Sequence, residues 1–104
     1  MTENPLIKYQ KQISDLAKKH QISYLALFGS YARGDQTSDS DIDLLVQYHQ
    51  RVGIFDHVAS QLAVEKLLQK SVDLVSINSL DPMLRPNIMK DIQVIYDQRS
   101  SHIS

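Results

Sequence analysis

Acidic residues gather in one short stretch of the chain. It holds four carboxylates, those of Asp35, Asp39, Asp41 and Asp43, and no Lys or Arg lies between them. Like charges this close repel one another, and the residues that follow are apolar, so the cluster is costly unless a cation is present. Mg²⁺ binds proteins through one or two carboxylates together with substrate phosphates and water. The spacing of Asp41 and Asp43 therefore predicts a magnesium site.

A Gly-Ser pair precedes the carboxylates. Gly29 follows the apolar run 22–28, and Ser30 opens a short helical stretch that Gly34 ends. Because Gly29 has no side chain, backbone N–H groups can approach a phosphate closely there, and the start of a helix attracts anions. We therefore expect Gly29 and Ser30 to hold the phosphates that accompany the metal. Two roles are equally expected for Arg33, contacting a phosphate or bracing the acidic cluster, and a plain surface role is the next alternative.

A further carboxylate, Asp73, stands within the apolar run 72–75. An unpaired carboxylate in apolar surroundings is costly, which favours a functional role over the alternative of a residue at the entrance of a strand with access to solvent. We predict that Asp73 is a third metal ligand and draws the proton from an attacking hydroxyl.

Other polar and aromatic residues receive simpler assignments. Tyr31 is left open between stacking on a base and local packing, while Asp35 and Asp39 are assigned to turns. His49 and His57 have no partners at metal-ligand spacing and are expected on the surface.

Two strands must position these groups. Strands over 22–28 and 41–48 are joined by about a dozen residues, which is short for a parallel crossover that carries a full helix, so we expect antiparallel pairing. A helix over 53–70 is long enough to return the chain to a third strand, 71–77, parallel to the second. This topology brings the Gly-Ser pair and all three predicted metal ligands to one edge of a mixed sheet.

The remaining elements complete an α/β arrangement with a sheet of three or four strands flanked by helices. An N-terminal helix is expected to be capped by Asn4, to start at Pro5 and to direct four apolar residues inward, namely Leu6, Ile13, Leu16 and Ala17. The long helix is expected to have one apolar face, made by Ile54, Phe55, Val58, Ala59 and Leu62, from which Val64, Leu67 and Leu68 are rotated away. A further helix capped by Asp81 is expected to begin at Pro82 and to break or restart at Pro86, followed by a strand over 92–96 and a frayed tail over 99–104.

Size and composition narrow the class of protein. At 104 residues we expect one domain, 1–104, and a net charge of -1 argues against broad, direct nucleic-acid binding. There is no cysteine, which excludes disulfides and fits a reducing compartment. With no signal-peptide character and no membrane-spanning run, a cytoplasmic protein without membrane contact is expected.

The segments 28–35 and 38–46 resemble the minimal nucleotidyltransferases, the small members of the DNA-polymerase-β-like superfamily. The signature of this family is G-S-x10-D-x-D, and the sequence matches it from Gly29 through Asp43. The run 72–75 resembles the strand that carries the third carboxylate of the family. Segments 52–56 and 82–97 are also similar, so the resemblance covers nearly the whole chain.

The resemblance implies a polymerase-β-like nucleotidyltransferase fold that uses ATP as substrate and Mg²⁺, with two ions expected. It further implies an MntA-type antitoxin of a HEPN/MNT toxin–antitoxin pair, which transfers AMP to a tyrosine of its partner, a HEPN-domain ribonuclease toxin, and silences it in a hetero-oligomer. The site residues would be Gly29, Ser30 and Arg33 for the nucleotide, and Asp41, Asp43 and Asp73 for metal and catalysis. Two alternatives stay open: an antitoxin that acts by binding alone, and nucleotidyl transfer to a small molecule.

Overall fold

Residues 6–101 are described by the computed structural model of the protein, and they alternate between helices and strands. No helix in this range is long and apolar enough to cross a lipid bilayer. The elements are η1 (Ile7–Tyr9), α1 (Gln10–Lys19), β1 (Ile22–Phe28), α2 (Gly29–Arg33), β2 (Ile42–Tyr48), α3 (Ile54–Leu68), β3 (Val72–Ser76), η2 (Ile77–Ser79), α4 (Arg85–Met89), β4 (Gln93–Asp97) and α5 (Gln98–Ser101).

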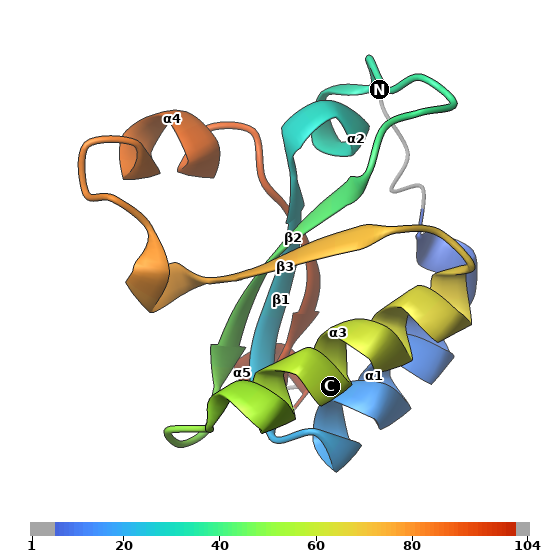
Figure 1. The fold of residues 1–104 in the computed structure, drawn as a ribbon, viewed down its shortest axis with the longest axis vertical. Helices are drawn as coiled ribbons and strands as arrows, with labels where there is room; N and C mark the ends of the chain where they lie inside the picture. The colour runs from blue at the N-terminus through green and yellow to red at the C-terminus, as the bar shows by residue number, and fades with distance from the viewer. Residues whose placement is uncertain (1–5, 102–104) are drawn as a thin grey trace.

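The four strands form one mixed sheet in the order β3-β2-β1-β4 (Figure 1). β1 pairs antiparallel with both β2 and β4, while β2 and β3 run parallel. These pairings confirm the predicted antiparallel first pair and the parallel third strand. β2 begins one residue later than expected, so Asp41 lies in the loop just before the strand.

Helices α1 and α3 lie side by side on one face of the sheet (Figure 1). Alternate strand residues such as Leu25, Leu27 and Leu44 belong to one buried cluster with side chains of both helices. Leu6, Ile13 and Ala17 are buried and Leu16 is partly buried, as the periodicity predicted. The expected cap Asn4 and helix start Pro5 lie outside the described residues.

The long helix α3 turns a different face to the core than the sequence suggested. The predicted apolar face is exposed, with Phe55 88% and Ile54 74% accessible. The buried residues of α3 are instead Ser60, Val64 and Leu68. Ser60 can be buried because its hydroxyl donates to the backbone carbonyl of Asp56 at 3.0 Å, which satisfies its polar group.

This orientation predicts unequal effects for one substitution made at two places on α3. Val64 is 2% exposed and Val58 is 47% exposed. We expect Val64→Ala to lower the free energy of unfolding by about 2 kcal/mol, and Val58→Ala by less than about 0.5 kcal/mol. Urea denaturation of the two variants measures both values. Equal losses would contradict the observed orientation of α3.

The connection from β3 to β4 departs from the sequence prediction in detail. Asp81 accepts the N–H of Met83 at 2.9 Å and so closes a turn rather than capping a helix at Pro82. The helix restarts as α4 at Arg85 with Pro86 in its first turn, where a missing N–H costs little.

The end of the chain is more ordered than expected as far as it is described. The segment predicted as a frayed tail contains the short helix α5, and Arg99 pairs with Asp97 at 3.2 Å. The tail beyond residue 101 lies outside the described residues.

Candidate active site

The sheet brings the predicted site residues to one edge. Asp43 on β2 is in register with Asp73 on β3 and, on its other side, with Phe28 at the end of β1. Gly29 and Ser30 follow Phe28 directly as the start of α2. Because Asp43 alternates with the core residue Leu44, it belongs to the face of the sheet away from α1 and α3. The acids and the Gly-Ser pair therefore share a corner of this face.

Gly29 occupies a position at this corner that has no room for a side chain. Its φ of 74° lies in the left-handed region, which glycine adopts without strain. A Cβ built at Gly29 would collide with the Oδ2 atom of Asp43 and lie 3.1 Å from its Cγ. The carboxylate of Asp43 therefore fits against the backbone at the turn that the sequence predicted to hold phosphates.

Two further acidic residues act on the carboxyl group of Asp43. Burial raises the pKa of its carboxyl group, and the charges of Asp73 and Asp41 raise it further, while Arg33 lowers it. The guanidinium Nε of Arg33 donates to Asp35 at 3.3 Å, so Arg33 braces the acidic cluster. The contact of Arg33 with a phosphate, the other role considered, stays a prediction.

Asp73 differs from its expected surroundings. The apolar run around it suggested a buried carboxylate, yet Asp73 is exposed. The reason is that β3 is an edge strand and the face that carries Asp73 is not covered by α1 or α3. Within residues 6–101 no three acidic or imidazole groups are gathered closely enough to form a ready three-ligand metal site. The charges of Asp41 and Asp73 act on Asp43, but the three carboxylates do not form a preassembled metal site.

The sequence agrees with a known family over the elements that build this corner. The family model described as polymerase beta, nucleotidyltransferase matches residues 11–101. The chain belongs to this nucleotidyltransferase family. The match contains all six predicted site residues, and it confirms the resemblance and the fold class inferred from the sequence.

Relatives of this nucleotidyltransferase include MJ0435 of Methanocaldococcus jannaschii, which carries the provisional name protein adenylyltransferase. It is 34% identical over 82 residues, which cover 79% of this chain and 88% of the relative. A solved structure provisionally described as a minimal nucleotidyltransferase is 35% identical with a TM-score of 0.74, and the match covers 85% of this chain and 90% of that one. A complex of tri-AMPylated Shewanella oneidensis HEPN toxin with MNT antitoxin contains a chain of the same fold, with 18% identity and a TM-score of 0.67, and the match covers 92% of this chain and 76% of that one.

The donor set of the nucleotidyltransferase suits a hard divalent cation. Carboxylate oxygens are the ligands that Mg²⁺ prefers, and Mg²⁺ completes its shell with substrate phosphates and water. The excess of negative charge around Asp43, which Arg33 offsets only in part, is the feature of this chain that fits such an ion.

The raised pKa of Asp43 gives a pH-dependent prediction for stability. A folded-state pKa above the unfolded value contributes stability below the unfolded pKa, and this contribution is lost as pH rises through the folded pKa. We therefore expect Asp43→Asn to raise the melting temperature at pH 7 without divalent metal, and the gain to vanish as pH falls below about 4. Thermal unfolding between pH 3 and 8 measures this. A difference that does not vary with pH would show that the charge is not its cause.

One positioning contact was not found from the sequence. The side-chain amide of Gln93, at the start of β4, donates to the backbone carbonyl of Ala32 at 2.8 Å. This bond ties the short helix α2, which carries Ser30, to a strand 61 residues away in sequence. A glutamine at the start of a strand carries no local signal for such a role.

We expect Gln93→Ala to loosen α2. Loss of one partly buried hydrogen bond is worth about 1 kcal/mol, and we expect the KM for ATP to rise about fivefold while kcat changes less. Steady-state kinetics of nucleotidyl transfer measures this split. Gln12→Ala, an exposed substitution on α1, is the matched control and leaves both constants unchanged. A fivefold fall of kcat with no change in KM would contradict the positioning role.

Two further residues are placed by the structure. His57, expected on the surface, is half-buried, and its ring nitrogens lie 2.9 Å from the Tyr48 hydroxyl and 2.8 Å from the Leu74 carbonyl oxygen. The surface prediction was wrong because these partners come from β2 and β3 and are distant in sequence. Tyr31 packs against the core, with Lys70 Nζ 5.8 Å from its ring centroid, which favours the local-packing role.

Proposed function

We propose that this chain is a Mg²⁺-dependent adenylyltransferase antitoxin, acting as a single cytoplasmic domain. It transfers AMP from ATP to a tyrosine of a partner HEPN ribonuclease and thereby neutralises that toxin. One observation carries the proposal: the carboxylate of Asp43 is fitted against the side-chain-free turn at Gly29, where the negative charges of Asp41 and Asp73 also act on it.

The proposed roles follow the geometry of the corner. Asp41, Asp43 and Asp73 would hold two Mg²⁺ ions, which would neutralise the phosphates and polarise the reacting phosphoryl group. The backbone at Gly29 and the hydroxyl of Ser30 would hold the outer phosphates, with Arg33 at the end of the same short helix. The exposure of Asp73 suits a base, because an incoming hydroxyl can reach it from solvent.

The proposed reaction balances as a substitution at phosphorus. A tyrosine oxygen of the partner forms a bond to the α-phosphorus of ATP, and the bond from that phosphorus to the pyrophosphate oxygen breaks. Pyrophosphate leaves, and the hydroxyl proton passes to the carboxylate of Asp73. The product is an AMP-tyrosine ester.

A protein partner is supported from two sides. The HEPN–MNT complex has a chain of the same fold and a toxin that carries AMP. This chain also leaves several large apolar side chains exposed, which is typical of proteins that form complexes. They are Ile54, Phe55, Val58, Leu62, Met83 and Leu84. We therefore propose a hetero-oligomer rather than a free monomer.

The test is the mass of the partner. The chain is incubated with its HEPN partner, ATP and Mg²⁺, and intact mass spectrometry is expected to show a gain of one or more AMP groups on the partner. The gain should disappear when EDTA replaces Mg²⁺. Loss of toxin activity without any gain in mass would favour inhibition by binding alone, and AMP found only on a small acceptor would overturn the protein substrate.

A further inference from the structure

A cavity of about 750 Å³ lies at the end of the sheet opposite to the carboxylates. Its walls come from the ends of β2 and β3, the loop 49–53, the first turn of α3 and η2. Because β2 and β3 are parallel, this is the carboxyl end of both strands, whereas Asp43 and Asp73 lie at their amino ends. From Asp43 to Tyr48 an extended strand spans about 16 Å. The cavity is therefore separate from the candidate active site, and its volume is typical of small-molecule sites.

The cavity is lined by basic and neutral side chains. His49, Arg51 and His57 are among its lining residues, and no Asp or Glu of the described chain is. Arg51 is exposed, and within residues 6–101 its guanidinium takes part in no ion pair. This contrasts with the acidic corner at the other end of the same strands. A free guanidinium in a cavity without carboxylates favours an anionic occupant.

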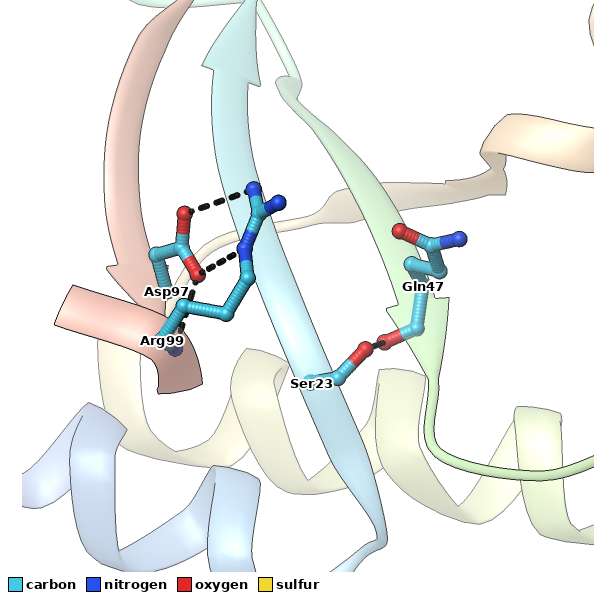
Figure 2. A network of polar contacts seen from close by, with 4 residues as sticks. All are labelled: Ser23, Gln47, Asp97 and Arg99. Atoms are coloured by element: carbon cyan, nitrogen blue, oxygen red, sulfur yellow. Dashed lines mark hydrogen bonds and ion pairs between the residues drawn. The ribbon is translucent and has the colours of Figure 1, made fainter. Parts of the chain in front are cut away.

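Two carboxylates, those of Asp97 and Asp56, lie near the cavity without lining it. Figure 2 shows Asp97, at the end of β4 and beside the start of β1, held by Arg99, with Nη2 of Arg99 3.2 Å from Oδ2 of Asp97. Asp97 is thus paired within its own segment. Asp56, in the first turn of α3, is not a lining residue, but its charge reaches the lining residue Tyr48, whose pKa is raised by burial and further by Asp56. Among the described lining residues Arg51 is the only Lys or Arg, and its guanidinium stays charged at any pH at which the protein is folded.

One wall of the cavity is rigid. His57 Nε2 lies 2.8 Å from the Leu74 carbonyl oxygen, which can only accept, so Nε2 carries the proton. In the neutral ring Nδ1 then accepts from the Tyr48 hydroxyl at 2.9 Å. The two rings meet edge to face, with centroids 5.9 Å apart. A wall fixed in this way loses little conformational entropy when a ligand packs against it.

We propose that this cavity is a second binding site, for a small organic anion that carries a phosphate or carboxylate on a ring or apolar body. Arg51 holds the anionic group, and the body packs against Tyr48, His57 and Ile54. The asymmetry of charge along β2 and β3 and the fixed aromatic wall are what the proposal rests on. It does not depend on the proposed transferase function.

The test uses AMP, benzoate and adenosine as probes in ¹H–¹⁵N NMR titrations of the whole chain. EDTA is present throughout, so that binding through a metal at the carboxylates is excluded. We expect AMP or benzoate to shift amide signals of residues 49–54 and 76–79 saturably, and adenosine to shift none of them. Which anion binds distinguishes a phosphate ligand from a carboxylate ligand. Arg51→Gln should raise the Kd about tenfold, because a hydrogen bond to a charged group is lost.

The control is Lys11→Gln, which removes an exposed cation from the first turn of α1, a helix that contributes no residue to the cavity lining, and should leave the Kd unchanged. Equal shifts with adenosine, or an unchanged Kd in Arg51→Gln, would overturn the proposal. So would shifts confined to residues 29–43, since these would assign the anion to the candidate active site. That last result would leave the proposed transferase function standing, and failure of the mass assay would leave the second site standing.

Discussion

Replacing Asp41 and Asp43 together by asparagine is expected to lower AMP transfer more than about 1000-fold. A metal-bound phosphoryl group gains several kcal/mol of stabilisation in the transition state, and each 1.36 kcal/mol is worth a factor of ten in rate. Asparagine keeps the size of each side chain but removes the charge that would hold Mg²⁺. The rate of AMP transfer to the partner, followed by intact mass, measures the loss.

The same double variant should be at least as stable as the parent chain without metal. Burial raises the pKa of Asp43 and repulsion by Asp73 and Asp41 raises it further, and neither effect acts on an uncharged asparagine. Asp39→Asn is the matched control, since Asp39 is an exposed aspartate of the same loop whose backbone N–H bonds to Thr37 Oγ1 at 3.3 Å. It should retain full transfer. A double variant that is folded and still active would exclude this pair as the metal-binding carboxylates.

Stability and function are therefore opposed at this corner. The free chain bears a cluster of carboxylates whose repulsion is relieved only by protonation or by a cation. Because the fold places Asp43 beside Asp73, the repulsion lowers the free energy of unfolding of the unliganded chain. In the proposed function, relief of this repulsion adds to the affinity for the metal, because a divalent ion is bound best where negative charge is already held in place.

The sequence was sufficient for the parts of the fold that local patterns determine. The run 22–28, the Gly-Ser turn and the short loop to 42 define an antiparallel pair, and the length of the following helix allows a parallel return. Strand alternation and register then bring Asp43, Asp73 and Gly29 to one corner. The G-S-x10-D-x-D spacing carried the same information as a family signature.

Contacts between distant segments could not be predicted in this way. Helix α3 carries apolar residues on two sides, so its periodicity could not show that Val64 rather than Phe55 faces the core. The exposure of Asp73 depends on β3 being an edge strand, which the apolar run around it conceals. The hydrogen bonds of Gln93 and His57 join residues separated by many positions, and no local motif records them.

The second large effect is expected for Gly29→Ser. An L-residue at a φ of 74° costs about 1–2 kcal/mol, and the added Cβ would also collide with the Asp43 carboxylate. We expect a loss of more than about 2 kcal/mol in the free energy of unfolding. AMP transfer should fall about 100-fold even where the variant is folded, because displacement of a catalytic group by about 1 Å can cost that much. Urea denaturation and the mass assay measure the two effects separately.

The same substitution at Gly53 provides the control. Gly53 is the N-cap of α3 with a φ of -78° and a ψ of 172°, and nothing lies within 4 Å of a Cβ built there. Serine is a favourable N-cap residue in this conformation, so Gly53→Ser should change the free energy of unfolding by no more than about 0.5 kcal/mol and leave transfer intact. If both variants behave alike, the close approach of Asp43 to the turn at Gly29 is not what the site requires. If only Gly29→Ser fails, the glycine of the signature is there to make room for the carboxylate as well as for a phosphate.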